Sequence, residues 1–152
     1  MVIVTRATLE NNGLLFLRDV LRHNLTDKQT PSRDPSAWIV KSPLKNEDID
    51  PPMVILDSSS VNEDRVTFSG GIVTTLTVGI MVWSKSIQYR DELSDEIKAV
   101  FQDDSNTDGT NSMLSQGLTY LSGPSRNNDG YIQGYSELLR IKEMDLVFQF
   151  IQ

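Results

Sequence analysis

Hydrophobic and polar positions alternate most regularly in residues 72–84, directly before a second periodic segment at residues 86–102. In the first segment, even-numbered positions point to one face of a strand and odd-numbered positions to the other, because a pleated strand has a period of two. β-branched and apolar side chains dominate both sets. In the second segment Leu93, Ile97 and Phe101 form one apolar stripe, and charged residues cover the remaining positions. The pattern predicts a long strand followed by an amphipathic helix that lies across a sheet.

A helical period also occurs near the N-terminus, in residues 9–25. Leu14, Leu17 and Leu21 follow one another at intervals of three and four, with charged residues outside this stripe. Gly13 weakens the first turn by up to about 1 kcal/mol relative to alanine. The spacing nevertheless predicts a first amphipathic helix.

The region between the two helices contains short apolar runs separated by turn residues. Residues 26–36 are rich in proline, aspartate and hydroxyl residues, which predicts an exposed connection. Residues 38–40 and 53–56 are apolar and β-branched, which predicts two short strands. Residues 61–69 alternate polar and apolar side chains and lead to a glycine pair. They predict a polar, half-exposed hairpin arm that turns into the long strand.

The C-terminal third mixes polar and apolar segments. Residues 113–121 fit either a strand or a short helix, and residues 123–134, with their Asn, Asp and Gly cluster, predict a loop. Residues 135–151 predict a final strand. Its apolar positions change parity, which predicts a bulge or break near Lys142 and Glu143.

Together these elements predict an α+β fold in a single domain, residues 1–152. Strands that follow one another and are joined by Gly, Pro and Asn turns favour a mixed, mainly antiparallel sheet. The N-terminal helix and the second helix are expected to pack on one face of this sheet. The hairpin arm is expected to project from it.

Composition narrows the possible functions. The chain has 152 residues, a formal net charge of −7 and no cysteine, and its pI is near 4.6. It therefore has neither a disulfide framework nor a thiolate nucleophile. The negative charge disfavours tight binding to nucleic acid or to anionic membranes. No run approaches the eighteen or so apolar residues that a transmembrane helix needs, so no membrane partner is expected.

A possible metal site lies in residues 103–112. Asp104, Asn106 and Asp108 are followed by Gly109, which reproduces the first half of an EF-hand loop. The position that should supply a bidentate glutamate is Ser115. A solvated loop is therefore favoured, and a small calcium-dependent binding module is kept as an alternative. Otherwise no cofactor is expected.

Motifs typical of enzymes are absent from the sequence. His23 is the only histidine, and neither a Gly-x-Ser-x-Gly elbow nor a glycine-rich phosphate loop is present. A histidine near a helix C-terminus commonly interacts with the helix dipole. A metal-dependent hydrolase that uses scattered carboxylates remains a minor alternative, and no catalytic residue is predicted.

The order of elements resembles the tail terminator and tail completion, or neck, proteins of long-tailed bacteriophages and related archaeal tailed viruses. The resemblance rests on the helix ending at Leu25, the long strand ending at Trp83, its exit into the helix around Leu93, and the terminal strand through Phe148. It covers most of the chain as a pattern and has no signature residue.

The resemblance implies a structural virion protein, located in the tail or neck and assembled in the host cytoplasm. Such a subunit forms a ring, expected to be a homohexamer, at the head-proximal end of the tail tube. There it ends tube polymerisation and joins the tail to the head connector. Its partners would be its own copies, the tail tube protein and the connector protein, and DNA would pass through the lumen without specific binding. A head-tail adaptor or a tube subunit is the alternative virion role.

The arm supplies the interface candidates. An arm that contacts a neighbouring subunit would use residues from both of its faces, namely Val61, Glu63, Arg65, Val66 and Phe68.

Overall fold

The computed structural model describes residues 2–42, 49–65, 71–123, 127–132 and 139–151. The helical elements in chain order are η1 (Arg6–Thr8), α1 (Leu9–Asn24), α2 (Pro35–Trp38), α3 (Ile87–Gln102) and η3 (Leu114–Gln116). The strands are β1 (Ile39–Lys41), β2 (Met53–Arg65), β3 (Ile72–Ser84), β4 (Leu118–Ser122), β5 (Asn127–Ile132) and β6 (Leu139–Phe150). The predicted long strand and both predicted amphipathic helices are confirmed, each to within a residue or two.

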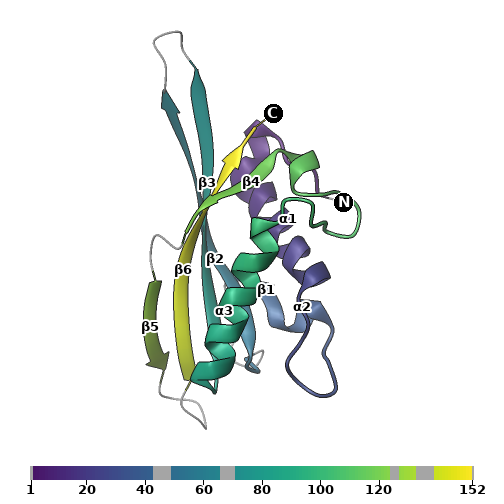
Figure 1. Cartoon of the computed structure of the whole chain (residues 1–152), viewed down its shortest axis with the longest axis vertical. Coiled ribbons are helices and arrows are strands. Elements are labelled where there is room, and N and C mark those ends of the chain that lie inside the picture. The colour runs from purple at the N-terminus through teal and green to yellow at the C-terminus, as the bar shows by residue number, and fades with distance from the viewer. Residues whose placement is uncertain (1, 43–48, 66–70, 124–126, 133–138, 152) are drawn as a thin grey trace.

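The described residues form one mixed sheet of six strands in the order β1-β2-β3-β6-β4, with β5 also paired to β6. β1 pairs with β2 in parallel, and the other pairings are antiparallel. Since β3 occupies one side of β6, β4 and β5 share its other side (Figure 1). The predicted α+β fold with a mixed, mainly antiparallel sheet is therefore confirmed.

Both long helices cover the same face of the sheet (Figure 1). α1 packs on β1, β2 and β3, and α3 packs on β3, β6 and β4. Leu76, Val78 and Ile80 of β3 are fully buried on this face, directly opposite Phe148, Leu146 and Met144 of β6. The alternation seen in the sequence thus corresponds to a helix-covered side and a side that carries half-buried residues.

One residue in or beside each long helix explains where the helix starts or how closely it packs. The Ser86 hydroxyl accepts a hydrogen bond from the backbone N–H of Tyr89 and caps the start of α3. In α1, a Cβ added at Gly13 would lie 2.7 Å from Cδ2 of Leu76. This glycine therefore allows α1 to approach β3 closely, which explains a residue that weakens the helix itself.

Several sequence predictions were wrong. Trp38 belongs to the short helix α2, whose N-cap is Asp34, and not to a strand. Residues 123–134 are not simply a loop, because they contain β5. Residues 113–121, which fitted two alternatives, form the turn η3 followed by β4.

The predicted bulge near Lys142 and Glu143 is also wrong, because β6 pairs with β3 without a register shift. Lys142 lies opposite the buried Val82 and so occupies an inward position. Its Nζ reaches to 3.7 Å from Oδ1 of Asp91 on α3. A long side chain with its charge paired at the margin of the core takes the place of an apolar residue there.

Candidate assembly surface

The inner part of β2 has neighbours on both sides, and its outer part has a described neighbour on one side alone. β1 pairs with Val54, Ile55 and Leu56, and the last backbone hydrogen bond described on that side runs from the N–H of Ser42 to the carbonyl of Leu56, at 3.0 Å. Beyond it, residues 58–65 pair with β3, and no described strand pairs with the other side of residues 57–65. We call this side of residues 57–65 the free edge. Unpaired N–H and C=O groups on such an edge can pair with another chain.

The free edge continues into a projecting hairpin, as predicted. Figure 1 shows the outer ends of β2 and β3 extending beyond the helices. Val61, Glu63 and Arg65 pair with Leu76, Thr74 and Ile72. Val61 has 37% and Ile72 48% of their surface exposed. Three of the predicted interface residues are therefore exposed on one face of the arm, whereas the other two, Val66 and Phe68, lie outside the described residues.

A β-bulge marks the junction between the body of β2 and the free edge. The register with β3 shifts between Leu56 and Ser58, so that Asp57 is left without a partner in the ladder. Opposite the bulge, a Cβ added at Gly79 would lie 2.6 Å from the Ser58 hydroxyl. Bulges bend a strand and increase its twist. The bulge at Asp57 therefore allows the outer part of β2 to bend relative to its inner part.

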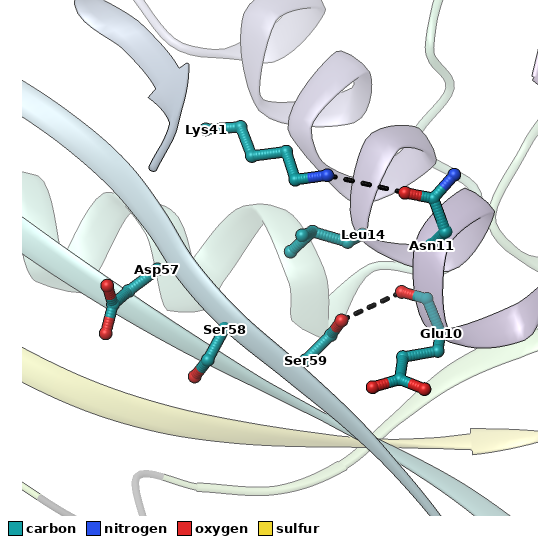
Figure 2. A pocket seen from close by; sticks show the side chains of 7 residues that line it. All are labelled: Glu10, Asn11, Leu14, Lys41, Asp57, Ser58 and Ser59. Atoms are coloured by element: carbon teal, nitrogen blue, oxygen red, sulfur yellow. Dashed lines mark hydrogen bonds between the residues drawn. The ribbon is translucent and has the colours of Figure 1, made fainter. Parts of the chain in front are cut away.

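A groove lies where β1 ends and the free edge begins (Figure 2). It has a volume of about 320 Å³ and is lined by residues of α1, β1 and β2, namely Glu10, Asn11, Leu14, Lys41, Asp57, Ser58 and Ser59. The Ser59 hydroxyl donates to the Glu10 carbonyl at 2.9 Å. The Lys41 ammonium donates to Oδ1 of Asn11 at 3.3 Å. These two bonds hold α1 beside the start of the free edge, with Leu14 between them (Figure 2).

A buried ion pair anchors the start of β2. Asp27 accepts hydrogen bonds from Nε of Arg33 at 2.8 Å and from Nη2 at 3.0 Å, and the Asp27 side chain is 1% exposed. Arg33 also donates to the carbonyls of Pro52 and Asp50 and lies over the ring of Trp38. The predicted exposed connection is thus partly wrong, because its Asp27 is buried and ties this segment to β2.

The same contacts set the ionisation of Asp27. Burial alone raises the pKa of this carboxyl, but hydrogen bonds from the Arg33 side chain and backbone and from the backbone of Gln29 outweigh that effect. They lower the pKa from 3.8 to about 2. Asp27 is therefore a carboxylate at neutral pH and stabilises the fold in that form.

The loop that resembles half of an EF-hand is tightly organised by its own hydrogen bonds. The Asn106 amide donates to the Val100 carbonyl at 2.7 Å, and the Asp108 carboxylate accepts two backbone N–H groups of the loop at 2.9 and 2.8 Å. Among the described residues, no three His, Cys, Asp or Glu side chains are grouped as a metal site requires. Calcium binding by Asp104, Asn106 and Asp108 remains an alternative that only a titration tests.

The single histidine lies against this loop. A Cβ at Gly109 would be 3.4 Å from Nδ1 of His23. The neighbouring Asn24 amide donates to the Thr107 carbonyl at 2.9 Å. The C-terminal turn of α1 thus holds the loop in place, which is a packing role for this part of the helix.

We did not predict a role at the surface for Asp57, for the serines that follow it, or for Lys41. The sequence carries no clear signal for it, because residues 53–56 are all apolar and residues 57–60 are all polar; the change of parity is seen in the pairing of β2 with β3. A change of parity inside an alternating strand is the mark of a bulge.

Comparison with known proteins gives a fold but no family. No protein-family model matches the sequence, and no curated protein matches it. Among solved structures, this chain is similar to a chain described as "Virion of native gene transfer agent (GTA) particle". The identity is 14%, the TM-score is 0.52, and the match covers 90% of this chain and 91% of that chain. The two chains share a fold.

The similarity extends over nearly the whole of both chains, so the sheet and the helices that cover it belong to one shared arrangement. At this identity the role of the chain must be argued from its own surface. In the described part of the chain, no helix has the length and apolar character needed to span a bilayer.

Proposed function

We propose that this protein is a structural subunit of a virion or virus-like particle. More specifically, it would form a ring at the head-proximal end of the tail tube, end tube growth, and present its other face to the head connector. The observation that carries the proposal is the projecting arm with its free edge, on a subunit whose fold is shared with a chain of a gene transfer agent virion. The chemistry required is recognition between subunits, and no catalytic step is assigned.

The arm suits a contact between neighbouring subunits. It projects beyond the helices (Figure 1), so it can reach a neighbour without disturbing the core beneath α1 and α3. Most of its described residues are polar, and Val61, Ile72 and the half-buried Val73 are the apolar ones among residues 61–65 and 72–75, a composition that favours solubility of a separate subunit. A strand edge gives affinity through backbone hydrogen bonds, and the side chains give specificity.

A ring of this kind would end a tube by geometry. One face would match the tube subunits, and the opposite face would differ from them and would accept no further tube ring. The net charge of −7 supports a lumen through which DNA passes, because an acidic lining does not bind the phosphate backbone. The acidity also contributes to solubility whatever the role of the chain.

The test is native mass spectrometry and negative-stain imaging of the purified protein, alone and mixed with tail tubes of the particle that encodes it. We expect rings at one end of each tube and no tube growth beyond them. Glu63→Arg should reduce tube capping, and Asp95→Arg on the exposed surface of α3 is the matched control. Self-assembly into long tubes would instead identify a tube subunit, and failure to bind tubes would reject the proposal.

A further inference from the structure

The free edge presents unpaired backbone groups at every second residue. The Leu56 carbonyl accepts the Ser42 N–H, so the backbone of Leu56 turns toward β1 and forms no hydrogen-bonded pair with Ile80, its partner on β3. Along an antiparallel ladder, hydrogen-bonded and non-hydrogen-bonded pairs alternate. Since β3 runs along β6 without a register shift, the β2 partners of every second β3 residue beyond Ile80 also turn their N–H and C=O groups outward. These partners are Ser59, Val61, Glu63 and Arg65.

The side chains of the free edge divide between two faces, and the face away from α1 is acidic. A Cβ added at Gly79 would lie 2.6 Å from the Ser58 hydroxyl, so Ser58 lies on the face opposite to the helix-covered core. Asp57, displaced by the bulge, lies on the same face, and the alternation of the strand places Asp64 there too. Asp64 accepts a hydrogen bond from the Asn62 amide at 2.9 Å. Neither carboxylate has a cationic partner among the described residues, and both are exposed.

The face toward α1 carries the groove. β1 ends at Lys41 beside it (Figure 2), so a strand added along the free edge would continue the line of β1. One of its side chains would enter the groove, whose volume is about 320 Å³ and whose lining includes Leu14. The next side chain on that face would lie against Val61, which is 37% exposed. This face therefore suits apolar side chains at alternate positions.

We propose that the free edge binds an extended segment of a different protein, with lysine or arginine at two positions six residues apart on one face and apolar side chains on the other. The two basic side chains would lie opposite Ser58, next to Asp57, and opposite Asp64. Opposite charges on neighbouring strands stabilise the pairing. Backbone hydrogen bonds to the outward groups would hold the segment, and its side chains would provide the selectivity.

A second copy of the free edge is a poor occupant for the same reason. If two edges lay antiparallel about Val61, Ser58 of one copy would face Asp64 of the other, with Asp57 beside it. Two carboxylates would then meet at each end of the pair, and like charges destabilise it. Bulges and charges protect exposed edges in this way. The acidic face thus keeps identical edges apart and admits a basic segment.

A designed peptide tests the pairing on the intact protein. The probe is acetyl-Lys-Val-Thr-Val-Thr-Val-Lys-amide, which has the same side-chain order in both directions and so fits the edge in either orientation. The control peptide has glutamate in place of both lysines. At low ionic strength we expect the lysine peptide to bind about tenfold more tightly in an NMR titration. Equal affinities of the two peptides would overturn the proposal.

The same titration tests where the peptide binds. Hydrogen bonds to an added strand should slow exchange of the outward amide hydrogens, those of Ser59, Val61, Glu63 and Arg65, more than that of the amide hydrogens between them. The latter already face β3. Protection confined to another part of the chain would overturn the proposal.

Charge reversal separates the acidic face from the net charge of the protein. Asp57→Lys combined with Asp64→Lys should reverse the preference, so that the glutamate peptide binds more tightly. Glu92→Lys combined with Asp95→Lys, at exposed positions of α3, changes the net charge equally and should keep the preference for the lysine peptide. Circular dichroism checks that both variants fold. A control variant that reverses the preference as fully as the edge variant would overturn the proposal.

The binding itself does not depend on the proposed function. If the protein caps tail tubes, the tube protein or the head connector would supply the segment, and this identification alone rests on the proposed function. Peptide binding at the edge by a protein that never caps tubes would keep the edge site and reject the ring. Capping by a protein that does not distinguish the two peptides would keep the ring and reject the edge site.

Discussion

Replacing Asp27 by asparagine should destabilise the protein in a manner that depends on pH. The carboxylate is almost fully buried and takes two hydrogen bonds from the Arg33 guanidinium, and a neutral amide in its place would leave that cation without its counter-charge. The fall in pKa from 3.8 to about 2 corresponds to roughly 2 to 3 kcal/mol of stabilisation by the ionised form. The free energy of unfolding at pH 7 should therefore drop by about this amount.

The sign of the pH dependence follows from the depressed pKa. Stabilisation by Asp27 is complete above the unfolded-state pKa of 3.8 and is lost as the pH falls through that value toward about 2. At pH 3 about half of it should remain. Urea unfolding of the wild type and of Asp27→Asn at pH 7 and pH 3 measures this change in the difference between them.

Asp95→Asn is the matched control for this experiment. The Asp95 side chain is 74% exposed and its ion pair with Lys98 lies on the surface of α3, so its loss should change stability by less than about 0.5 kcal/mol. Two results would refute the reasoning. One is an Asp27→Asn variant no less stable than this control, and the other is an equal loss of stability at both pH values.

Three further predictions concern the core and the loops. Gly117→Ala should cost about 1 to 3 kcal/mol, because φ is +77° and the new Cβ would lie 2.2 Å from the Ile151 carbonyl oxygen; equal stability in urea unfolding would contradict this. Phe101→Ala should cost about 3 to 5 kcal/mol, since the ring is fully buried against Phe148 at a centroid distance of 5.0 Å; a loss below about 1 kcal/mol in the same assay would argue against that packing. Millimolar calcium should leave the melting temperature unchanged relative to chelator, because the Asp108 carboxylate already accepts two N–H groups of its own loop; a clear rise would restore the calcium alternative.

The elements that could be predicted from the sequence are those whose signal is local. β3 and α3 each carry a full period of apolar positions, and Ser86 between them provides a helix cap. α1 carries a comparable stripe. Their positions in one layered core follow from burying these faces together, which is why the fold class was predictable.

The elements that were missed depend on partners distant in the chain. β5 contains Asn127, Asn128, Asp129 and Gly130, whose local chemistry favours a turn, yet they pair with β6. Long-range backbone pairing overrides such weak local preferences. Likewise β2 was predicted as two pieces, since the serines after Asp57 have little strand preference, and their pairing with β3 makes the strand continuous.

The candidate surface was predictable in part. The glycine pair and the alternation before it indicated a projecting arm, and the structure contains one. The free edge was not predictable, because it exists only where β1 stops beside β2. That relation joins residues 39–41 to residues 54–56 across an intervening connection, and no local pattern encodes it.

The inner and outer parts of β2 have different neighbours, so their backbone hydrogen bonds should differ in how readily they open. Amide hydrogens in its inner part lie between two paired strands and beneath buried side chains, so they should exchange with solvent only on global unfolding. Among the described strands, β3 alone pairs with residues 58–65, and most side chains there are exposed. Their amide hydrogens should therefore exchange through local opening of the strand. A change in the conformation of the arm would then cost only a small part of the free energy of folding.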